Sequence, residues 1–85
     1  MNLEIRYFAS VRETLGRSGE SVSLPAEVRT LADLRAYLVA RGAPWSEALA
    51  DGRALRIACN QQMATPETLL SPGCEVAFFP PVTGG

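Results

Sequence analysis

The residues that could do chemistry stand in the last stretch of the sequence, where Gly84 and Gly85 follow Val82 and Thr83. Glycine has no Cβ, so a Gly-Gly end fits a narrow channel and lets another molecule's catalytic groups approach the backbone closely. A carboxylate is a poor electrophile, and ATP can convert it into an acyl-adenylate that a sulfur or nitrogen nucleophile attacks. We therefore expect Gly85 to be the reacting residue. The alternative is a loose glycine tail, because chain termini are commonly poorly ordered.

The segment before this tail reads as a strand. Val76 and Phe78 alternate with Glu75, Ala77 and Phe79, and this period of two is typical of a strand with two different faces. Pro80 and Pro81 then end the strand, because proline has no N–H to donate. We expect a domain over residues 1–79 and a flexible tail over residues 80–85, which reaches at most roughly 20 Å at about 3.3 Å per residue.

Composition narrows the possible functions. The chain has 85 residues, enough for one small domain, and its net charge of −1 argues against nucleic acid or an acidic membrane surface as a partner. It has no histidine and no lysine, which excludes histidine-assisted nucleophiles, a Walker A loop and a Schiff base. We expect a cytoplasmic protein that binds no metal and no cofactor itself and is not catalytic alone. Cys59 and Cys74 are expected to be buried structural thiols.

Two alternating segments open the chain. The first, over residues 2–9, places Leu3, Ile5 and Tyr7 on a core face and leaves Phe8 exposed at the strand end. Residues 10–19 are expected to be a connection that turns at the glycines. Residues 21–25 then form a second strand, antiparallel to the first.

The main helix is predicted to begin at Thr30, with Asp33 as the partner of a capping box, and to end at Gly42. An apolar stripe is expected to face the sheet, while Arg35 and Arg41 face water. The stripe consists of Leu31, Leu34, Leu38 and Tyr37.

The remaining elements are short. Residues 44–50 form a second helical segment, in which Trp45 acts as a lid over the core at the sheet edge. Residues 55–59 and 63–64 are expected to be strands, and residues 66–70 a single helical turn. This order predicts an α+β roll, in which a mixed sheet of about five strands is covered on one face by one main helix and a short second helix.

The order of elements resembles the β-grasp, or ubiquitin-like, fold. The ending Glu75-Val76-Ala77-Phe78-Phe79-Pro80-Pro81-Val82-Thr83-Gly84-Gly85 resembles the small, sulfur-carrying subunit of molybdopterin synthase, the MoaD type. Phe8 followed by Val11-Arg12-Glu13, then Trp45, Asn60-Gln61 and Gly73, add matches in the right order along nearly the whole chain.

The resemblance implies a carrier cycle. An activating enzyme of the ubiquitin-E1 type would adenylate Gly85 with ATP and magnesium, and a sulfur donor, a cysteine desulfurase or a rhodanese-like protein, would convert it to a thiocarboxylate. The tail would then enter the large synthase subunit and pass sulfur to cyclic pyranopterin monophosphate, which becomes the dithiolene of molybdopterin. The carrier would be a non-catalytic subunit that is loaded, consumed and reloaded.

The exposed aromatic residues fit such a partner. Phe8 and Phe79 are out of phase with the core residues of their strands, so neighbouring strands would bring the rings together, with Met63 close by. The resemblance implies that Phe8, Met63 and the chain from Phe79 through Pro80, Pro81, Val82, Thr83 and Gly84 bind partners. Arg12 is a further candidate, and a solvated arginine is the alternative for it.

Three other functions remain open. The chain could carry sulfur for thiamine or another thiolated product, although the thiamine type usually lacks the Phe-Phe-Pro-Pro-Val-Thr string. It could instead be a protein modifier that forms isopeptide bonds through Gly85. It could also be a plain binding module that keeps its function without Gly84 and Gly85.

Overall fold

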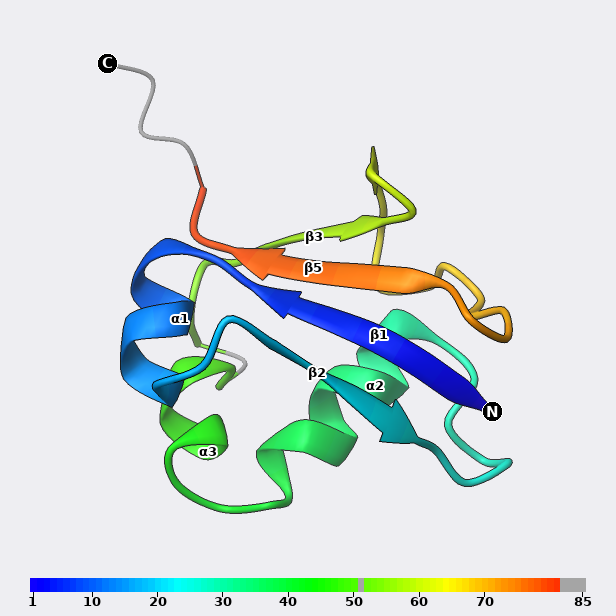
Figure 1. Ribbon diagram of the computed structural model, residues 1–85, viewed down its shortest axis with the longest axis horizontal. Helices are drawn as coiled ribbons and strands as arrows, with labels where there is room; N and C mark the ends of the chain where they lie inside the picture. Colours follow the sequence, from blue (N-terminus) through cyan, green and yellow to red (C-terminus); the bar gives the residue numbers. More distant parts are fainter. Residues whose placement is uncertain (51, 82–85) are drawn as a thin grey trace.

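The computed structural model describes residues 1–50 and 52–81, which form a five-stranded mixed sheet and three helices. The sheet has the order β2-β1-β5-β3-β4, with bounds β1 (Asn2–Tyr7), β2 (Gly19–Ser23), β3 (Arg56–Cys59), β4 (Gln62–Met63) and β5 (Glu75–Phe79). The central strands β1 and β5 run parallel, and the other neighbours are antiparallel. The helices α1 (Ala9–Leu15), α2 (Leu31–Val39) and α3 (Trp45–Ala48) lie on one side of this sheet (Figure 1). The expected α+β architecture is confirmed.

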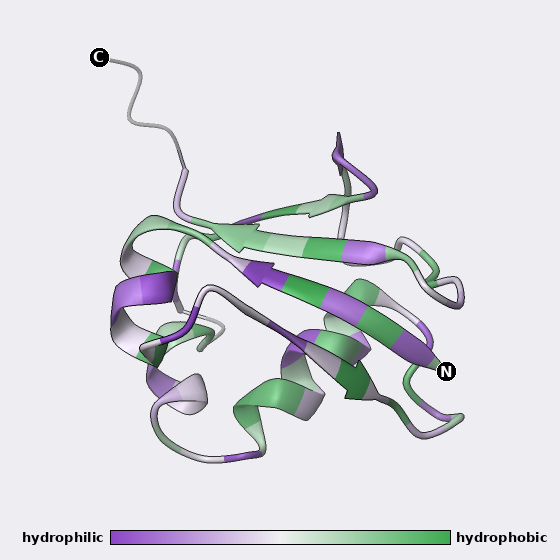
Figure 2. Ribbon diagram, viewed as in Figure 1, coloured by the Kyte–Doolittle hydropathy of each residue, from purple (hydrophilic) through white to green (hydrophobic). Residues whose placement is uncertain are grey.

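The core lies between the sheet and the helices. Apolar and polar residues alternate along β1 (Figure 2), and Leu3, Ile5 and Tyr7 are all buried. On β5, Val76 and Phe78 are fully buried. The leucines of the predicted α2 stripe are also fully buried, and burying such a side chain stabilises the fold by about 1.5–3 kcal/mol. The other face of the sheet carries no helix within the described residues.

The start of α2 is as predicted. The Thr30 hydroxyl accepts a hydrogen bond from the Asp33 N–H at 3.1 Å, and the Asp33 carboxylate accepts one from the Thr30 N–H at 3.1 Å. The same carboxylate accepts the Arg29 N–H at 3.0 Å. The N–H groups of Arg29 and Thr30 together hold the pKa of Asp33 below its usual value. This reciprocal capping box was readable from the sequence because it is closed within four residues.

The prediction of a simple connection over residues 10–19 is wrong, because Ala9–Leu15 form helix α1. Val11 and Leu15, one helical turn apart, are buried and hold α1 against the core. The helix has no side-chain cap at Phe8, so its start lacks the usual sequence signal. It ends at Gly16, whose φ of 73° is left-handed and whose N–H donates to the Arg12 carbonyl at 2.8 Å.

The predicted pairing of the first two strands is confirmed, and Gly19 is part of it. Arg6 and Gly19 face each other across the β1–β2 ladder. A Cβ on Gly19 would lie 2.5 Å from the Ile5 carbonyl oxygen. Only glycine therefore allows β2 to approach β1 this closely.

Two further predictions need correction. Residues 66–70 are not a helical turn: Thr68 donates its N–H to the Thr65 carbonyl at 3.0 Å, and Leu69 then forms a bridge with Thr30. Arg35 does not face water but donates to the carbonyls of Leu49, Ala50 and Arg53. Its guanidinium thereby fixes the segment that follows α3.

Arg41 forms an ion pair with Glu20, donating to both carboxylate oxygens at 2.9 and 3.1 Å. The guanidinium carbon lies 4.8 Å from the centroid of the Trp45 ring, and that of Arg17 lies 5.3 Å from it. Trp45 is half-buried and packs against the core, as expected. No helix among the described residues has the length and apolar character needed to cross a bilayer.

Candidate functional site

The candidate site is built around the end of β5. This strand ends at Phe79 and is followed by Pro80 and Pro81, which are half-buried. Prolines offer no N–H, so the β1–β5 and β3–β5 ladders cannot continue past this point. The predicted reacting and tail residues Val82, Thr83, Gly84 and Gly85 lie outside the described residues. The division into a domain over residues 1–79 and a tail over residues 80–85 stays a prediction.

The parallel pairing of β1 and β5 brings Phe8 next to Phe79. Tyr7 is in register with Phe78, and the Phe8 N–H donates to the Phe78 carbonyl at 3.1 Å. Phe8 is still extended, with φ −125° and ψ 155°, so the alternation of faces carries through to it. Because Tyr7 and Phe78 are buried, Phe8 and Phe79 both point to the uncovered face. The expected pairing of the two strands is confirmed, and it makes Phe8 and Phe79 neighbours on one face; contact between their rings stays a prediction.

A second row of apolar residues crosses the same face. Ala77 on β5 is in register with Ala58 on β3, and Ala58 is in register with Met63 on β4. The buried neighbours Val76 and Ile57 fix the orientation of this row toward the uncovered face.

We call the set formed by Phe8, Ala58, Met63, Ala77 and Phe79 the open-face patch. Two of its members are among the most exposed large apolar side chains described, with exposed fractions of 48% for Phe8 and 61% for Met63. Met63 is two strands away from β5 and in the row of Ala77, not of Phe79, so it is at least about 10 Å from Phe79 at the usual strand spacing. The expectation that Met63 lies close to the two rings is therefore wrong, and the alanines join it to the aromatic pair. Ala58 and Ala77 were missed by sequence reasoning, and only the alternation around Ile57 and Val76 could have indicated them.

Charged groups border the open-face patch on both sides. Glu4 and Glu75 are in register on one side, where Arg6 contacts Glu75 at 3.3 Å and the Ser21 hydroxyl donates to Glu4. On the other side Arg56 is in register with Phe79. Arg12, a predicted contact residue, is exposed in the last turn of α1.

A partly buried polar cluster lies on the core side of β1, behind the aromatic end of the site. The Tyr7 hydroxyl donates to the Glu20 carboxylate at 2.8 Å, and Arg41 neutralises that carboxylate. Burial raises the pKa of Tyr7, and the hydrogen bond to Glu20 raises it further. Burial opposes ionisation of Glu20, but the Tyr7 hydroxyl and Arg41 outweigh it and hold the pKa of Glu20 below its usual value. The cluster fixes the end of β1 that carries Phe8.

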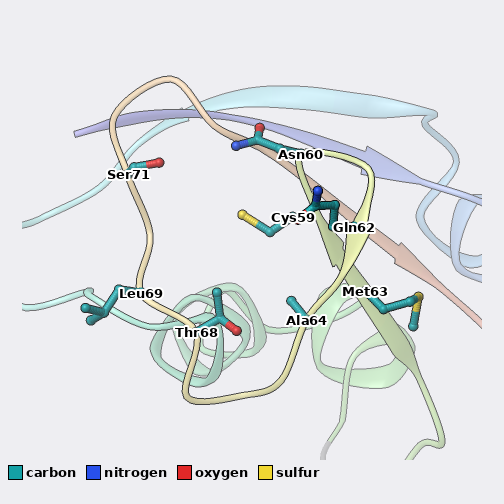
Figure 3. Close-up of a pocket in the computed structure, with 8 residues that line it drawn as sticks. All are labelled: Cys59, Asn60, Gln62, Met63, Ala64, Thr68, Leu69 and Ser71. Carbon is teal, nitrogen blue, oxygen red and sulfur yellow. The ribbon is translucent and has the colours of Figure 1, made fainter.

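A groove of about 310 Å³ lies beside the β3–β4 hairpin and the segment that precedes β5 (Figure 3). The Cys59 thiol and the Ser71 hydroxyl point into it, while Met63 and Leu69 stand at its rim. Burial, and then the neighbouring Cys74 thiol, raise the pKa of Cys59, so this thiol is a weak nucleophile at neutral pH. Both cysteines are free thiols; Cys74 is buried, as expected, whereas Cys59 is only half-buried, so the expectation that it is a buried thiol is wrong.

A five-stranded mixed sheet that holds a helix on one face, with parallel first and last strands, defines a protein of the β-grasp, or ubiquitin-like, class. The chain belongs to the ThiS family, whose model matches residues 5–85. The family resemblance noted in the sequence is therefore confirmed.

Three proteins are similar to this chain over nearly its full length. The chain is 41% identical over 83 residues to the "Molybdopterin synthase sulfur carrier subunit" of Escherichia coli (strain K12), covering 98% of this chain and 99% of that one. Among solved structures it is similar to the Helicobacter pylori 26695 complex of subunits 1 and 2 of molybdopterin-converting factor, with 26% identity, a TM-score of 0.68 and complete coverage of both chains. It is also similar to Haloferax volcanii small archaeal modifier protein 1, with 26% identity, a TM-score of 0.73 and coverage of 95% and 98%.

Proposed function

We propose that this chain is the sulfur carrier subunit of a molybdopterin synthase, with Gly85 as the residue that carries the sulfur. The observation that carries this proposal is the 41% identity to the Escherichia coli sulfur carrier subunit across 98% of the chain. The Gly84-Gly85 ending and the strand and diproline before it agree with a carboxylate that is presented to other proteins.

The chemistry begins with activation in an E1-like enzyme. The Gly85 carboxylate attacks the α-phosphate of ATP, pyrophosphate leaves, and an acyl-adenylate forms. The outer sulfur of a persulfide on a cysteine desulfurase or a rhodanese-like protein then displaces AMP and forms an acyl disulfide. A thiol cleaves the S–S bond, forms a disulfide with the donor cysteine and releases the thiocarboxylate. ATP and magnesium are substrates and cofactors of the activating enzyme, so this chain needs no nucleotide site of its own.

The loaded carrier then delivers its sulfur in the large synthase subunit. The thiocarboxylate tail enters that subunit and passes sulfur to cyclic pyranopterin monophosphate to build the dithiolene. Gly85 returns to a carboxylate and is reloaded. The catalytic groups belong to the large subunit, and this chain acts as a stoichiometric co-substrate.

The open-face patch supports a docking role for this cycle. It is apolar, lies on the face that carries no helix, and reaches the point where β5 gives way to the tail. A partner seated on Phe8 and Phe79 would hold the tail close to its own active site, since a buried aromatic anchor dominates the binding energy of many interfaces. Arg12 lies four residues after Phe8 in the sequence and is proposed as a peripheral contact.

The first experiment is an intact mass of the protein isolated from its own cells. We expect a fraction in which one oxygen of the C-terminal carboxylate is replaced by sulfur. If only the free carboxylate appears, even after incubation with ATP, magnesium and the activating and sulfur-donating proteins, the carrier proposal is wrong.

Deletion of Gly85 tests the same residue in the cell. The variant should unfold in urea at the same midpoint as the full chain and should lose all molybdoenzyme activity. Normal molybdoenzyme activity with the deleted chain would contradict the proposal.

Replacement of Phe79 by glutamate tests the docking surface. A charge placed in the centre of an apolar contact should raise the Kd for the large subunit at least about tenfold. The matched control is Ala26→Glu, which adds the same charge at an exposed turn before α2. Equal affinities of the two variants would show that the docking surface lies elsewhere.

Protein modification is a second candidate because the chain is similar to Haloferax volcanii small archaeal modifier protein 1. In that case the activated Gly85 would form isopeptide bonds with lysine side chains of other proteins. A conjugate ladder in cell extract that disappears when the chain is cut before Gly84 would favour this function. A sulfur carrier for thiamine or another thiolated product would instead load normally and leave molybdopterin synthesis unaffected when deleted.

A further inference from the structure

Arg56 is an exposed arginine on strand β3, beside the end of β5. All eight positive charges are arginines, and within residues 1–50 and 52–81 three of them form ion pairs with Glu20 or Glu75. Arg35 binds three backbone carbonyls. Of the arginines on β-strands, Arg6 is paired, and Arg56 makes no ion pair or hydrogen bond with the described side chains.

The register places Arg56 at the border of the open-face patch, beside Phe79. It is directly opposite Phe79 in the β3–β5 ladder and is two residues before Ala58 on the same strand. Ile57 between them is buried, so Arg56 and Ala58 both point to the uncovered face. Side chains directly opposite each other on one face of an antiparallel pair have Cβ atoms about 4.5–5.5 Å apart. A partner that covers Phe79 must therefore also cover Arg56.

A partner that covers Arg56 must supply an anion that compensates its charge. A guanidinium is always charged, and removing it from water without a compensating anion is strongly unfavourable. Its planar donors match a carboxylate in a two-hydrogen-bond contact. The other border of the patch contains Glu4 and Glu75 together with Arg6, which pairs with Glu75 at 3.3 Å, so that border carries one net negative charge and Arg56 one positive charge.

We propose that Arg56 is a specificity-determining contact that pairs with a carboxylate of the large synthase subunit beside the point where the tail leaves β5. This inference rests on the proposed function, because it requires a partner on the open-face patch. A partner that lacks an acidic residue at this position would bury an unpaired charge and be rejected. The ion pair would thus set the orientation of docking, with the tail pointing into the partner.

The test compares Arg56→Gln with Arg29→Gln in binding to the purified large subunit. Both substitutions remove one positive charge, and both side chains are exposed, but Arg29 lies in the segment before α2. We expect Arg56→Gln to raise the Kd about tenfold and Arg29→Gln to change it less than twofold. Charge reversal in Arg56→Glu should raise the Kd about a hundredfold.

The dependence of Kd on ionic strength distinguishes pairing from a merely structural role. The wild-type Kd should rise with salt more steeply than that of Arg56→Gln, because the variant has lost the ion pair that salt screens. Converting the terminal carboxylate of both proteins into an amide should leave this difference in slope unchanged. If the difference disappears, the acceptor is the carrier's own terminal carboxylate, and the proposal is overturned.

The outcomes separate this inference from the function on which it rests. If Phe79→Glu weakens binding while Arg56→Glu binds as well as wild type, the ion pair does not exist and the proposed function stands. If the wild-type chain does not bind the large subunit at all, both are wrong. Thermal unfolding of every variant should match wild type within a few degrees, since Arg56 is exposed.

Discussion

Replacement of Glu20 by glutamine should test how the fold holds the aromatic end of the open-face patch. The Glu20 carboxylate accepts the Tyr7 hydroxyl at 2.8 Å and two contacts from Arg41 at 2.9 and 3.1 Å. Arg17 adds a weaker contact at 3.7 Å. The charged form of Glu20 therefore ties β1, β2 and the end of α2 together.

The size of the expected loss in stability follows from how far Glu20 and Arg41 are buried. Exposed ion pairs contribute about 0–1 kcal/mol, but the Glu20 side chain is only 13% exposed and that of Arg41 29%. Hydrogen bonds to a charged group in such a setting contribute about 1.5–3 kcal/mol. We expect Glu20→Gln to lower the free energy of unfolding by about 2 kcal/mol at pH 7. For a domain of this size the midpoint of thermal unfolding should fall by roughly 10 °C.

The pH dependence of the free energy of unfolding tests the role of the Glu20 charge more directly than the stability at pH 7. The pKa of Glu20 is lower in the folded chain than its usual value of 4.5, because hydrogen bonds from Tyr7 and Arg41 outweigh the effect of burial. Its stabilising contribution is therefore fully present above about pH 4.5 and is lost as the pH falls through the folded-state pKa. The free energies of unfolding of wild type and Glu20→Gln, measured in urea, should differ less and less as the pH is lowered from 5 to the pH at which the protein unfolds in acid. The pKa shift of Asp33 is common to both proteins and cancels.

The control is Glu13→Gln, which removes the same charge from an exposed position on α1. It should change stability by less than about 0.5 kcal/mol. If the Glu20→Gln difference were equally large at pH 3.5 and pH 7, the carboxylate charge would not be its source, and the reasoning would fail.

Two further predictions concern local structure. Gly19→Ala should destabilise the fold by more than about 1 kcal/mol, because its Cβ would meet the Ile5 carbonyl oxygen at 2.5 Å, whereas Gly52→Ala, with open space around its Cβ, should be nearly neutral. Chemical denaturation of both variants measures this, and equal midpoints would contradict it. Thr30→Ala should cost about 1 kcal/mol by removing the acceptor of the Asp33 N–H, while Thr14→Ala on the exposed side of α1 serves as control. A Thr30→Ala variant as stable as wild type would show that the capping box contributes nothing.

Some local features of the structure could be predicted from the sequence alone. The alternation of Leu3, Ile5 and Tyr7 fixed which face of β1 is buried, and the Thr30–Asp33 capping box fixed where α2 begins. Both are patterns closed within a few residues, so they do not depend on distant parts of the chain. The diproline after Phe79 likewise marked the end of β5.

Helix α1 and the hydrogen bonds of Arg35 could not be predicted from local sequence patterns. Ala9–Leu15 has no side-chain cap and is held by the burial of Val11 and Leu15 against the core. Arg35 appears solvent-facing from its helical position, but carbonyls after α3 capture its guanidinium. Such long side chains reach groups far away in sequence, and no spacing rule predicts which group lies within reach.

The sequence by itself determined the membership of the ThiS family, the two faces of each central strand and the exposure of Phe8, while Phe79, also expected to be exposed, is half-buried. Only the tertiary structure decided that these residues are neighbours. Phe8 and Phe79 are neighbours because β1 and β5 pair in parallel although they lie some seventy residues apart in the chain, and Arg56 joins them because β3 pairs with β5 in one particular register. The physical reason is that strand pairing is selected by the packing of the whole core, and a shift of one residue would turn every side chain of a strand to the other face.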